Sequence, residues 1–265
     1  MDERLALLLS GKAAIVGLWF LVFFTVERLR PAATAPHEHE KGSKPPRRLL
    51  RNGALWLINS GLSPLLVVPL TAWAASHSLA WRPSWWDGWS GLLLDLLLLD
   101  FLIYWWHRAN HEIPFLWRFH EVHHRDQFLD ATSAVRFHFG EVMLSATARA
   151  GIVWLLGFPL VSVLIFESLV LMAAIFHHSN LRLPPAVESG LSRIVITPGI
   201  HWVHHHARRR DTDSNYGTLL VLWDRLFGSR NRTPRRLDMA IGVEGRHDLS
   251  LWKLLLAPFQ RNRAA

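Results

Sequence analysis

Histidines are concentrated in one part of this chain and recur at helical spacing. Twelve of the sixteen fall between His107 and His206. Most of them form four tight groups, His107-x-x-x-His111, His120-x-x-His123-His124, His177-His178 and His201-x-x-His204-His205-His206. Residues three and four apart share one face of a helix, so each group directs its imidazoles at one point. The pattern predicts a multi-histidine metal centre. Isolated histidines such as His77 and His247, and the loop residues His37 and His39, are interpreted as ordinary surface or interfacial residues.

The composition places this centre in a membrane protein. Half of the 265 residues are hydrophobic, fourteen are Trp, and several apolar runs are long enough for membrane helices. Cysteine is absent, which excludes disulfides, iron–sulfur clusters and thiolate zinc sites. Any metal is therefore bound through nitrogen and oxygen.

The formal charge of +8 has a simpler explanation than nucleic acid. The basic residues lie mainly beside apolar segments and in the C-terminal tail, where anionic lipid headgroups attract them. No nucleic-acid recognition motif accompanies the charge. We expect a membrane partner and no nucleic acid.

Three apolar spans are expected before the histidine groups, at about residues 5–26, 53–75 and 89–106. The first is interpreted as an anchor rather than a cleaved signal peptide, because Glu27-Arg28 follows it in place of small residues. Ser63-Pro64 and Pro69 interrupt the second, as kinks that a membrane helix tolerates. Tryptophans flank the third, as expected at the two membrane interfaces.

The next apolar region, at about 142–176, decides whether one metal centre can form. If it crossed the membrane once, the histidines before and after it would lie on opposite faces. Gly157-Phe158-Pro159 combines a helix stop with a helix start near its middle. We therefore predict two shorter helices in a hairpin that returns the chain to its starting side.

These expectations define a fold and a domain plan. The fold is all-α, an integral membrane helical bundle with about four to five membrane-embedded helices and a cytoplasmic histidine-rich helical cap. The cytoplasmic side follows from the positive-inside rule, since the connection between the second and third spans carries only Arg82. The expected units are N-terminal helices with a basic loop at 1–88, a catalytic unit at 89–230 and a basic tail at 231–265.

Ligand type alone leaves several kinds of metal chemistry open. His120-Glu121-Val122-His123-His124 also fits the H-E-x-x-H pattern of zinc metalloproteases, with Glu121 as general base. That reading uses one zinc and leaves the other histidines without a role. A non-catalytic metal-binding membrane protein is a third possibility. A redox-capable centre at the ends of membrane helices instead suits oxidation of a lipid C–H bond.

Several motifs occur in the order seen in one known family. They are Asp100-Phe-Leu-Ile-Tyr-Trp-Trp-His107-Arg-Ala-Asn-His111, Leu116-Trp-Arg-Phe-His120-Glu-Val-His123-His124, Arg136-Phe-His138-Phe-Gly-Glu141, His178-Ser-Asn180, Thr197-Pro-Gly-Ile-His201-Trp-Val-His204-His205, Asn215-Tyr-Gly217 and Trp223-Asp-Arg-Leu-Phe-Gly228. Across about residues 100–228 the chain resembles the fatty acid hydroxylase and sterol desaturase superfamily. The first two spans and the last thirty or so residues carry no such signature.

The resemblance implies a membrane-bound non-haem di-iron enzyme that uses O2 and two external electrons to hydroxylate or desaturate a lipid. It implies ten metal ligands, His107, His111, His120, His123, His124, His138, His178, His201, His204 and His205, of which His138 could instead lie beside the ligands without binding metal. His177 and His206 fall outside its motifs. Glu121, Asn215 and Asp224 are the candidate catalytic residues, and with Asp100 they match polar positions that could accept an imidazole N–H.

The same resemblance supplies the cofactors and partners. Two iron ions are expected, which zinc could replace in a purified sample, with O2 as co-substrate. Since the chain shows no reductase or haem module, the electrons are expected from a separate ferredoxin- or cytochrome-like protein and its reductase. Arg208, Arg209 and Arg210 could attract headgroups or an acidic electron donor. The motifs do not identify the lipid.

Overall fold

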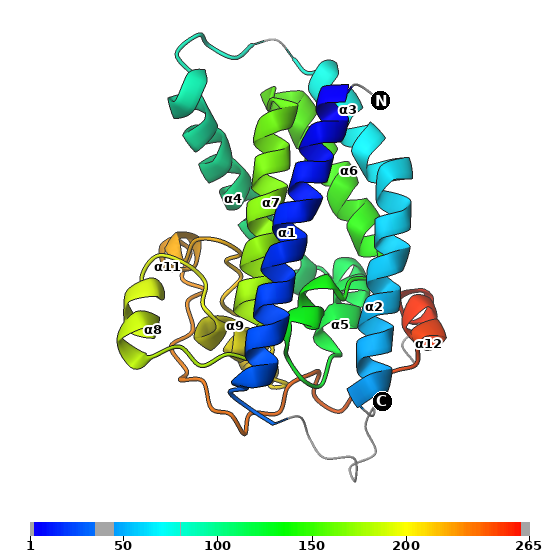
Figure 1. Ribbon diagram of the computed structural model, residues 1–265, viewed down its shortest axis with the longest axis vertical. Helices are drawn as coiled ribbons and strands as arrows, with labels where there is room; N and C mark the ends of the chain where they lie inside the picture. The colour runs from blue at the N-terminus through cyan, green and yellow to red at the C-terminus, as the bar shows by residue number, and fades with distance from the viewer. Residues whose placement is uncertain (1–2, 35–44, 80, 261–265) are drawn as a thin grey trace.

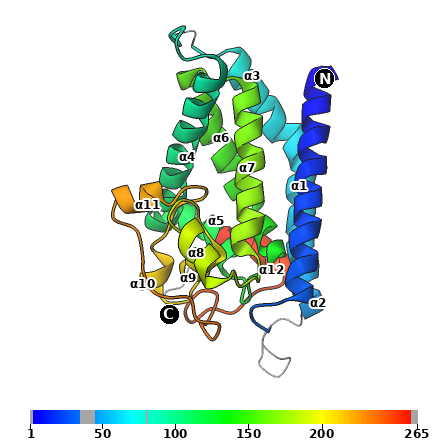
Figure 2. The same ribbon diagram turned by 60° about the vertical axis from the view of Figure 1, so that its left-hand side comes forward.

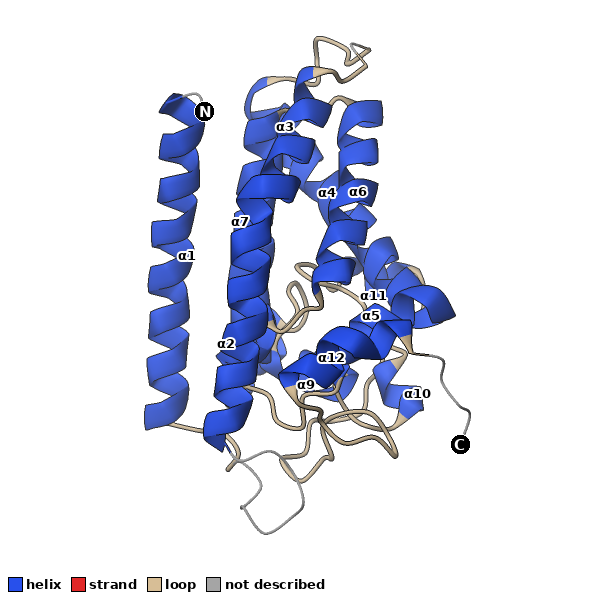
Figure 3. Ribbon diagram, turned by 90° about the vertical axis from the view of Figure 1, so that its right-hand side faces the viewer, coloured by secondary structure: helices blue, strands red, loops and turns tan. Residues whose placement is uncertain are grey.

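The computed structural model, which describes residues 3–34, 45–79 and 81–260, is a helical bundle with a cap at one end (Figure 1). Five helical spans are long and apolar enough to cross a membrane. They are α1 (Glu3–Leu29), α2 (Pro45–Leu62) continued through η1 (Ser63–Val67) into α3 (Val68–Ser76), α4 (Gly88–Glu112), α6 (Phe139–Leu156) and α7 (Leu160–His178). Figure 3 draws helices and loops, and the described residues form only isolated β-bridges. The predicted all-α multi-pass membrane fold is confirmed.

The cap gathers short helices at the end of the bundle opposite the N-terminus (Figure 2). It contains α5 (Pro114–His124), η2 (Ala131–Val135), α8 (Pro185–Leu191), α9 (Pro198–His204), α10 (Arg209–Thr212), α11 (Leu222–Leu226), α12 (Leu251–Leu256) and η3 (Ala257–Phe259). The chain enters it from α4, leaves through α6 and re-enters from α7. Segments that flank the α6–α7 hairpin therefore meet on one side.

The hairpin forms where the sequence predicts it. Gly157 ends α6 in the left-handed region at φ 68°, and its N–H donates to the carbonyl of Val153. Glycine suits this position because it has no Cβ to clash. Pro159 then precedes the first residue of α7, where its fixed φ suits a helix start.

The second span differs from its expected bounds and is not broken by its prolines. Helix begins at Pro45 rather than near residue 53, and one wider turn, η1, absorbs Pro64. The N–H of Val68 donates to the carbonyl of Ser63, five residues back. Such π-turns restore the hydrogen bonding that a proline removes, which the lipid environment requires.

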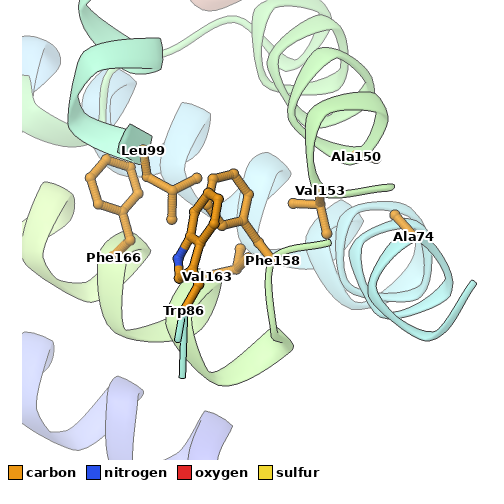
Figure 4. Packing of buried hydrophobic residues seen from close by; sticks show 8 residues of the cluster. All are labelled: Ala74, Trp86, Leu99, Ala150, Val153, Phe158, Val163 and Phe166. Carbon is orange, nitrogen blue, oxygen red and sulfur yellow. The ribbon is translucent and has the colours of Figure 1, made fainter. Parts of the chain in front are cut away.

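The main apolar core lies between α3, α4, α6 and α7, in the half of the bundle distant from the cap. Figure 4 shows eight of its residues, Ala74, Trp86, Leu99, Ala150, Val153, Phe158, Val163 and Phe166. Phe158, in the hairpin turn, is fully buried among them. The turn is thus packed into the core, which fixes the angle at which α7 returns to the cap.

A buried ionic network ties α2 to the loop that follows α5. Arg48 donates to Asp126 at 2.6 Å, to Asp130 at 2.8 Å and to the carbonyl of Phe128 at 2.7 Å. Burial alone would raise the pKa of Asp126, but the charges of Arg48 and Arg136, with hydrogen bonds from Arg48 and Asn52, together outweigh it and lower that pKa to about 2. The carboxylate therefore stays ionised, and the loop between α5 and η2 is held against α2.

We predict that Arg48→Ala removes about 3–5 kcal/mol of stability, because Asp126 loses its directly bonded cation and Asp130 keeps only Arg28, at 3.7 Å. Unfolding in detergent, followed by circular dichroism, measures the loss. Arg236→Ala is the matched control, since its pair with Asp238 has both side chains about two-thirds exposed, and should leave stability nearly unchanged. Equal unfolding temperatures for the two variants would contradict a structural role for the network.

Candidate metal centre

Nine of the ten predicted ligands come together inside the cap, in two groups. Group A contains His107, His111, His120, His124 and His204, and group B contains His123, His178, His201 and His205. Within each group, one ring nitrogen per residue lies within 4.8 Å of the others. Both groups combine residues from before and after the α6–α7 hairpin, as the predicted topology requires.

The chain has two pairs of adjacent histidines here, His123-His124 and His204-His205. Each pair places one histidine in group A and the other in group B. On α5, His120 and His124 are four residues apart and share group A, whereas His123 points to group B. At the end of α9 the arrangement is reversed, because His201 and His205 share group B and His204 belongs to group A. Neighbouring residues on a helix differ by about 100° in direction, so each pair divides between two sites. The His124 and His205 rings stack at 4.3 Å, which brings the groups side by side.

The remaining members come from the ends of two membrane helices. His107 and His111 lie in the last turns of α4, and His178 is the final residue of α7. Pro114 starts α5 after Ile113, the one non-helical residue that separates it from α4. Thr197 caps α9 by accepting the N–H of Ile200, as its position before Pro198 predicts.

In group B, ring nitrogens lie so close to one another that a cation between them would be stabilising. His123 donates its Nδ1–H to the carbonyl of Arg136 at 3.1 Å, and His178 donates its own to the carbonyl of Ala174 at 2.8 Å. Their Nε2 atoms therefore carry lone pairs, and these two atoms are 3.1 Å apart. His201 Nε2 lies 3.0 Å from that of His178. A metal ion between these atoms would remove the repulsion between the lone pairs.

In group A, two rings also carry their hydrogen on Nδ1, and several buried ring nitrogens have no hydrogen-bond partner among the described residues. His107 and His204 donate Nδ1–H to the carbonyls of Tyr216 at 2.8 Å and Ser214 at 2.7 Å. Among the described atoms, Nε2 of His111, His120 and His204 has no hydrogen-bond partner. Leaving such buried polar atoms unpaired costs about 1–3 kcal/mol each, so the donor set fits a bound metal.

Burial also keeps the imidazoles in the neutral form that metals require. Burial, followed by the neighbouring histidines, lowers the pKa of His124, His201 and His205 well below the usual value. Burial likewise lowers the pKa of His204 to about 3. Neutral, oriented rings without competing protons are suited to bind metal at physiological pH.

His138 is the one predicted ligand that the structure does not bring to either group. Its Nδ1 accepts the N–H of Gly140 at 2.9 Å, which caps α6. Its Nε2–H donates to the carbonyl of Leu255 at 3.0 Å. Both nitrogens are therefore occupied, and the ring joins α6 to the C-terminal segment. His177 and His206 also lie outside the groups, as expected.

The four polar residues predicted to accept imidazole N–H groups make other contacts. Glu121 pairs with Arg125 at 2.7 Å and lies 3.4 Å from Arg246, an arrangement that does not suit a protease general base. Asp100 accepts the indole N–H of Trp223. The side chains that accept an imidazole N–H are instead Glu141, 2.7 Å from His120 Nδ1, and Asp213, 3.3 Å from His111 Nδ1. The sequence carried a signal for Glu141, since it ends the motif that begins at Arg136.

Asp224 and Asn215 act on the histidines through the backbone. Asp224 accepts the N–H groups of Tyr216 and Gly217, and Asn215 adopts a left-handed φ of 53°. This turn directs the carbonyls on both sides of Asn215 at His204 and His107. A Cβ at Gly217 would lie 2.8 Å from the carboxylate of Asp224, so a larger residue would displace the turn.

Segments outside the predicted catalytic unit support group B. The buried guanidinium of Arg136 donates to the carbonyl of Val122, to Asn52 of α2 and to Asp248 of the C-terminal segment. Because the carbonyl of Arg136 orients His123, these contacts fix that ring as well. The second span and the C-terminal segment thus form part of the centre's framework.

The fatty acid hydroxylase family model matches residues 92–229. An ornithine lipid hydroxylase, OlsE, of Rhizobium tropici is 30% identical over 198 residues, which cover 75% of this chain and 59% of that protein. The alkylglycerol monooxygenases of Xenopus tropicalis and Danio rerio are each 31% identical, over 55% and 57% of this chain and 30% of each relative. The chain thus matches less than two-thirds of the length of these relatives. No solved structure matches it.

We predict that Glu141→Ala weakens metal retention about 10- to 100-fold, because His120 loses the acceptor that fixes its tautomer and orientation. Metal content is measured by mass spectrometry after dialysis against graded chelator. Glu121→Ala is the matched control on α5 and should retain metal like the unmodified protein. If Glu121→Ala lost metal as readily as Glu141→Ala, this assignment of the two carboxylates would be wrong.

Proposed function

The chain belongs to the fatty acid hydroxylase family, and on that premise we propose that it is a membrane-bound oxygenase. It uses O2 and two external electrons to hydroxylate or desaturate a C–H bond of a lipid. The observation that carries this proposal is the pair of adjacent histidine groups, each of which takes one member of His123-His124 and one member of His204-His205. A single-metal hydrolase would use three protein ligands and leave the second group without a role.

Iron is the metal that suits this activity, with one ion in each group. Iron bound there would activate O2 and supply the oxidising power for C–H cleavage, which amino-acid side chains cannot provide. The nine histidines would hold it, and Glu141, Asp213 and the carbonyls of Ser214, Tyr216 and Arg136 keep their rings oriented. Zinc in a purified sample would be a substitute, because imidazole ligands do not select between the two metals.

The protein contributes position and an apolar approach for the substrate. A small cavity of about 60 Å³ lies between α4, α6 and α7. Trp106, next to His107, and Ser145, one turn from Glu141, are among its lining residues. We propose that a lipid chain reaches group A between these three helices, where most of the residues that line the cavity are apolar and keep water away from the reaction.

Electrons would enter where the centre lies nearest the outer surface of the cap. The indole of Trp117 lies 5.1 Å from the His111 ring and 5.4 Å from that of His124. The largely exposed Arg209 stacks over this indole and donates to the carbonyl of His111. Arg208 and Arg210 are exposed beside it. This surface suits an acidic, separate electron-transfer protein.

The cap is proposed to face the cytoplasm. The connection between α3 and α4, at the opposite end, carries Arg82 alone, and that side chain pairs with Asp95. Arginines are numerous in the cap and the C-terminal segment. This asymmetry agrees with the positive-inside rule and with a cytoplasmic source of electrons.

We predict that His204→Ala and His178→Ala each lower bound iron and abolish lipid oxidation, because one ligand is removed from group A or group B. Lipid extracts of cells with and without the protein are compared by mass spectrometry for a gain of one oxygen or a loss of two hydrogens, with isotopic O2 as the oxygen source. His77→Ala, at the end of the bundle distant from the cap, should keep both iron and activity. Full turnover in either ligand variant would refute the proposed centre.

We also predict that Arg209→Glu slows reduction of the centre by a protein donor, by about tenfold at low salt, because it reverses a charge at the docking surface. The probe is a reduced acidic [2Fe–2S] ferredoxin, and reduction of the iron is followed spectroscopically. Dithionite should reduce the variant and the unmodified protein at similar rates. Arg236→Glu is the control, and an equal loss in that variant would show a general charge effect in place of a docking site.

A further inference from the structure

A row of three charged side chains crosses the membrane-spanning part of the bundle. Glu167 of α7 pairs with Lys12 of α1 at 2.5 Å and with Arg149 of α6 at 2.9 Å. All three residues lie within membrane spans. Two cations and one carboxylate leave a net formal charge of +1 in a low-dielectric region. Ionisable groups in such a region are costly and commonly mark a binding site.

A large apolar groove lies beside this row, between α1, α2, η1, α3 and α7. Its volume is about 890 Å³, within the range of small-molecule sites. On α7 its wall is formed by Leu160, Leu164, Glu167, Leu171 and Ile175, which share one helix face about 22 Å long at about 1.5 Å per residue. Among the described residues that line it, Lys12 and Glu167 are the ionisable ones. Figure 3 shows α1 at the rim of the bundle.

The groove is separate from the metal centre. None of the nine histidines of groups A and B is among its lining residues. Its inner end reaches Thr132 and Val135 of η2, where Ala131, Ala134 and Ile175 pack into a buried apolar cluster. A ligand in the groove would therefore lie behind the walls of the centre and away from the reacting atoms.

We propose that this groove binds one long-chain amphiphile with a single anionic head, a carboxylate or a phosphate, next to Lys12. Lys12 and Arg149 share the single carboxylate of Glu167, so the three groups keep a net charge of +1 that one anion beside Lys12 would neutralise. Thr71 also lines the groove, is 3% exposed, and its hydroxyl has no partner among the described residues. The hydroxyl, on α3, offers a second polar group to a ligand in the groove.

The length of the groove suits a single acyl chain. The wall is longer than the roughly 15 Å of one leaflet's hydrocarbon, which allows a full chain to lie along it. At Gly17 and Gly53, on facing helices, an added Cβ would meet no atom within 4 Å. A larger side chain at either glycine would therefore fill the groove without disturbing the packing of the helices.

The test uses the iron-loaded protein in phosphatidylcholine nanodiscs and three probes, ionised oleic acid, oleyl phosphate and oleyl alcohol. We expect saturable binding of one anionic probe per chain, measured by displacement of a fluorescent fatty acid, and much weaker binding of the alcohol. Lys12→Gln should weaken anionic binding about tenfold, since a charge-assisted contact is lost. Glu167→Gln should strengthen it, because two cations are then left for one anion. The preferred anionic probe distinguishes a carboxylate ligand from a phosphate one.

Two further variants separate binding from folding. Lys253→Gln, on the exposed side of α12, removes the same charge elsewhere and should bind the probes like the unmodified protein. Gly17→Phe fills the groove without changing charge and should abolish binding while iron content stays the same. Equal affinity for oleic acid and oleyl alcohol, or equal binding by Lys12→Gln and Lys253→Gln, would overturn the proposal. Because no group A or group B histidine lines the groove, this result is independent of the oxygenase assignment.

Discussion

Nine imidazoles gathered in the protein interior are the constraint on which the rest of this structure depends. The Nε2 lone pairs of His123 and His178 face one another at 3.1 Å and repel unless a cation binds between them. Water cannot solvate them, because burial excludes it, and protonation is opposed by the same burial. The arrangement is therefore stable only if the surrounding chain fixes each ring and a metal completes it.

The surrounding chain meets this requirement mainly with backbone carbonyls. Of the rings with a fixed tautomer, His107, His123, His178 and His204 donate to carbonyl oxygens, and His120 reaches a carboxylate. A carbonyl adds no net charge to the site. Its direction is set by the fold, which explains why Asp224 and Asn215 hold a turn instead of touching an imidazole.

The need to fix those carbonyls extends the functional unit beyond the region that the family model matches. Glu27 of α1 accepts the N–H groups of Ala131 and Asn180, which flank η2 and the end of α7. Arg48 and Asn52 of α2 hold the loop after α5, and the carbonyl of Leu255 accepts the Nε2–H of His138. The division of the chain at residues 88 and 230 stays a prediction, and these contacts cross both boundaries.

The sequence by itself determined the elements and most of the site, because both depend on short-range patterns. Helical spacing identified the histidine groups, and Gly157-Phe158-Pro159 required a hairpin that returns the chain to the cap. Only the tertiary structure decided how adjacent histidines divide between two groups, that His138 caps a helix, and that Glu141 rather than Glu121 orients His120. These outcomes depend on which backbone carbonyls and side chains reach each ring nitrogen. Such contacts join residues far apart in the chain, and their spacing along the sequence does not encode them.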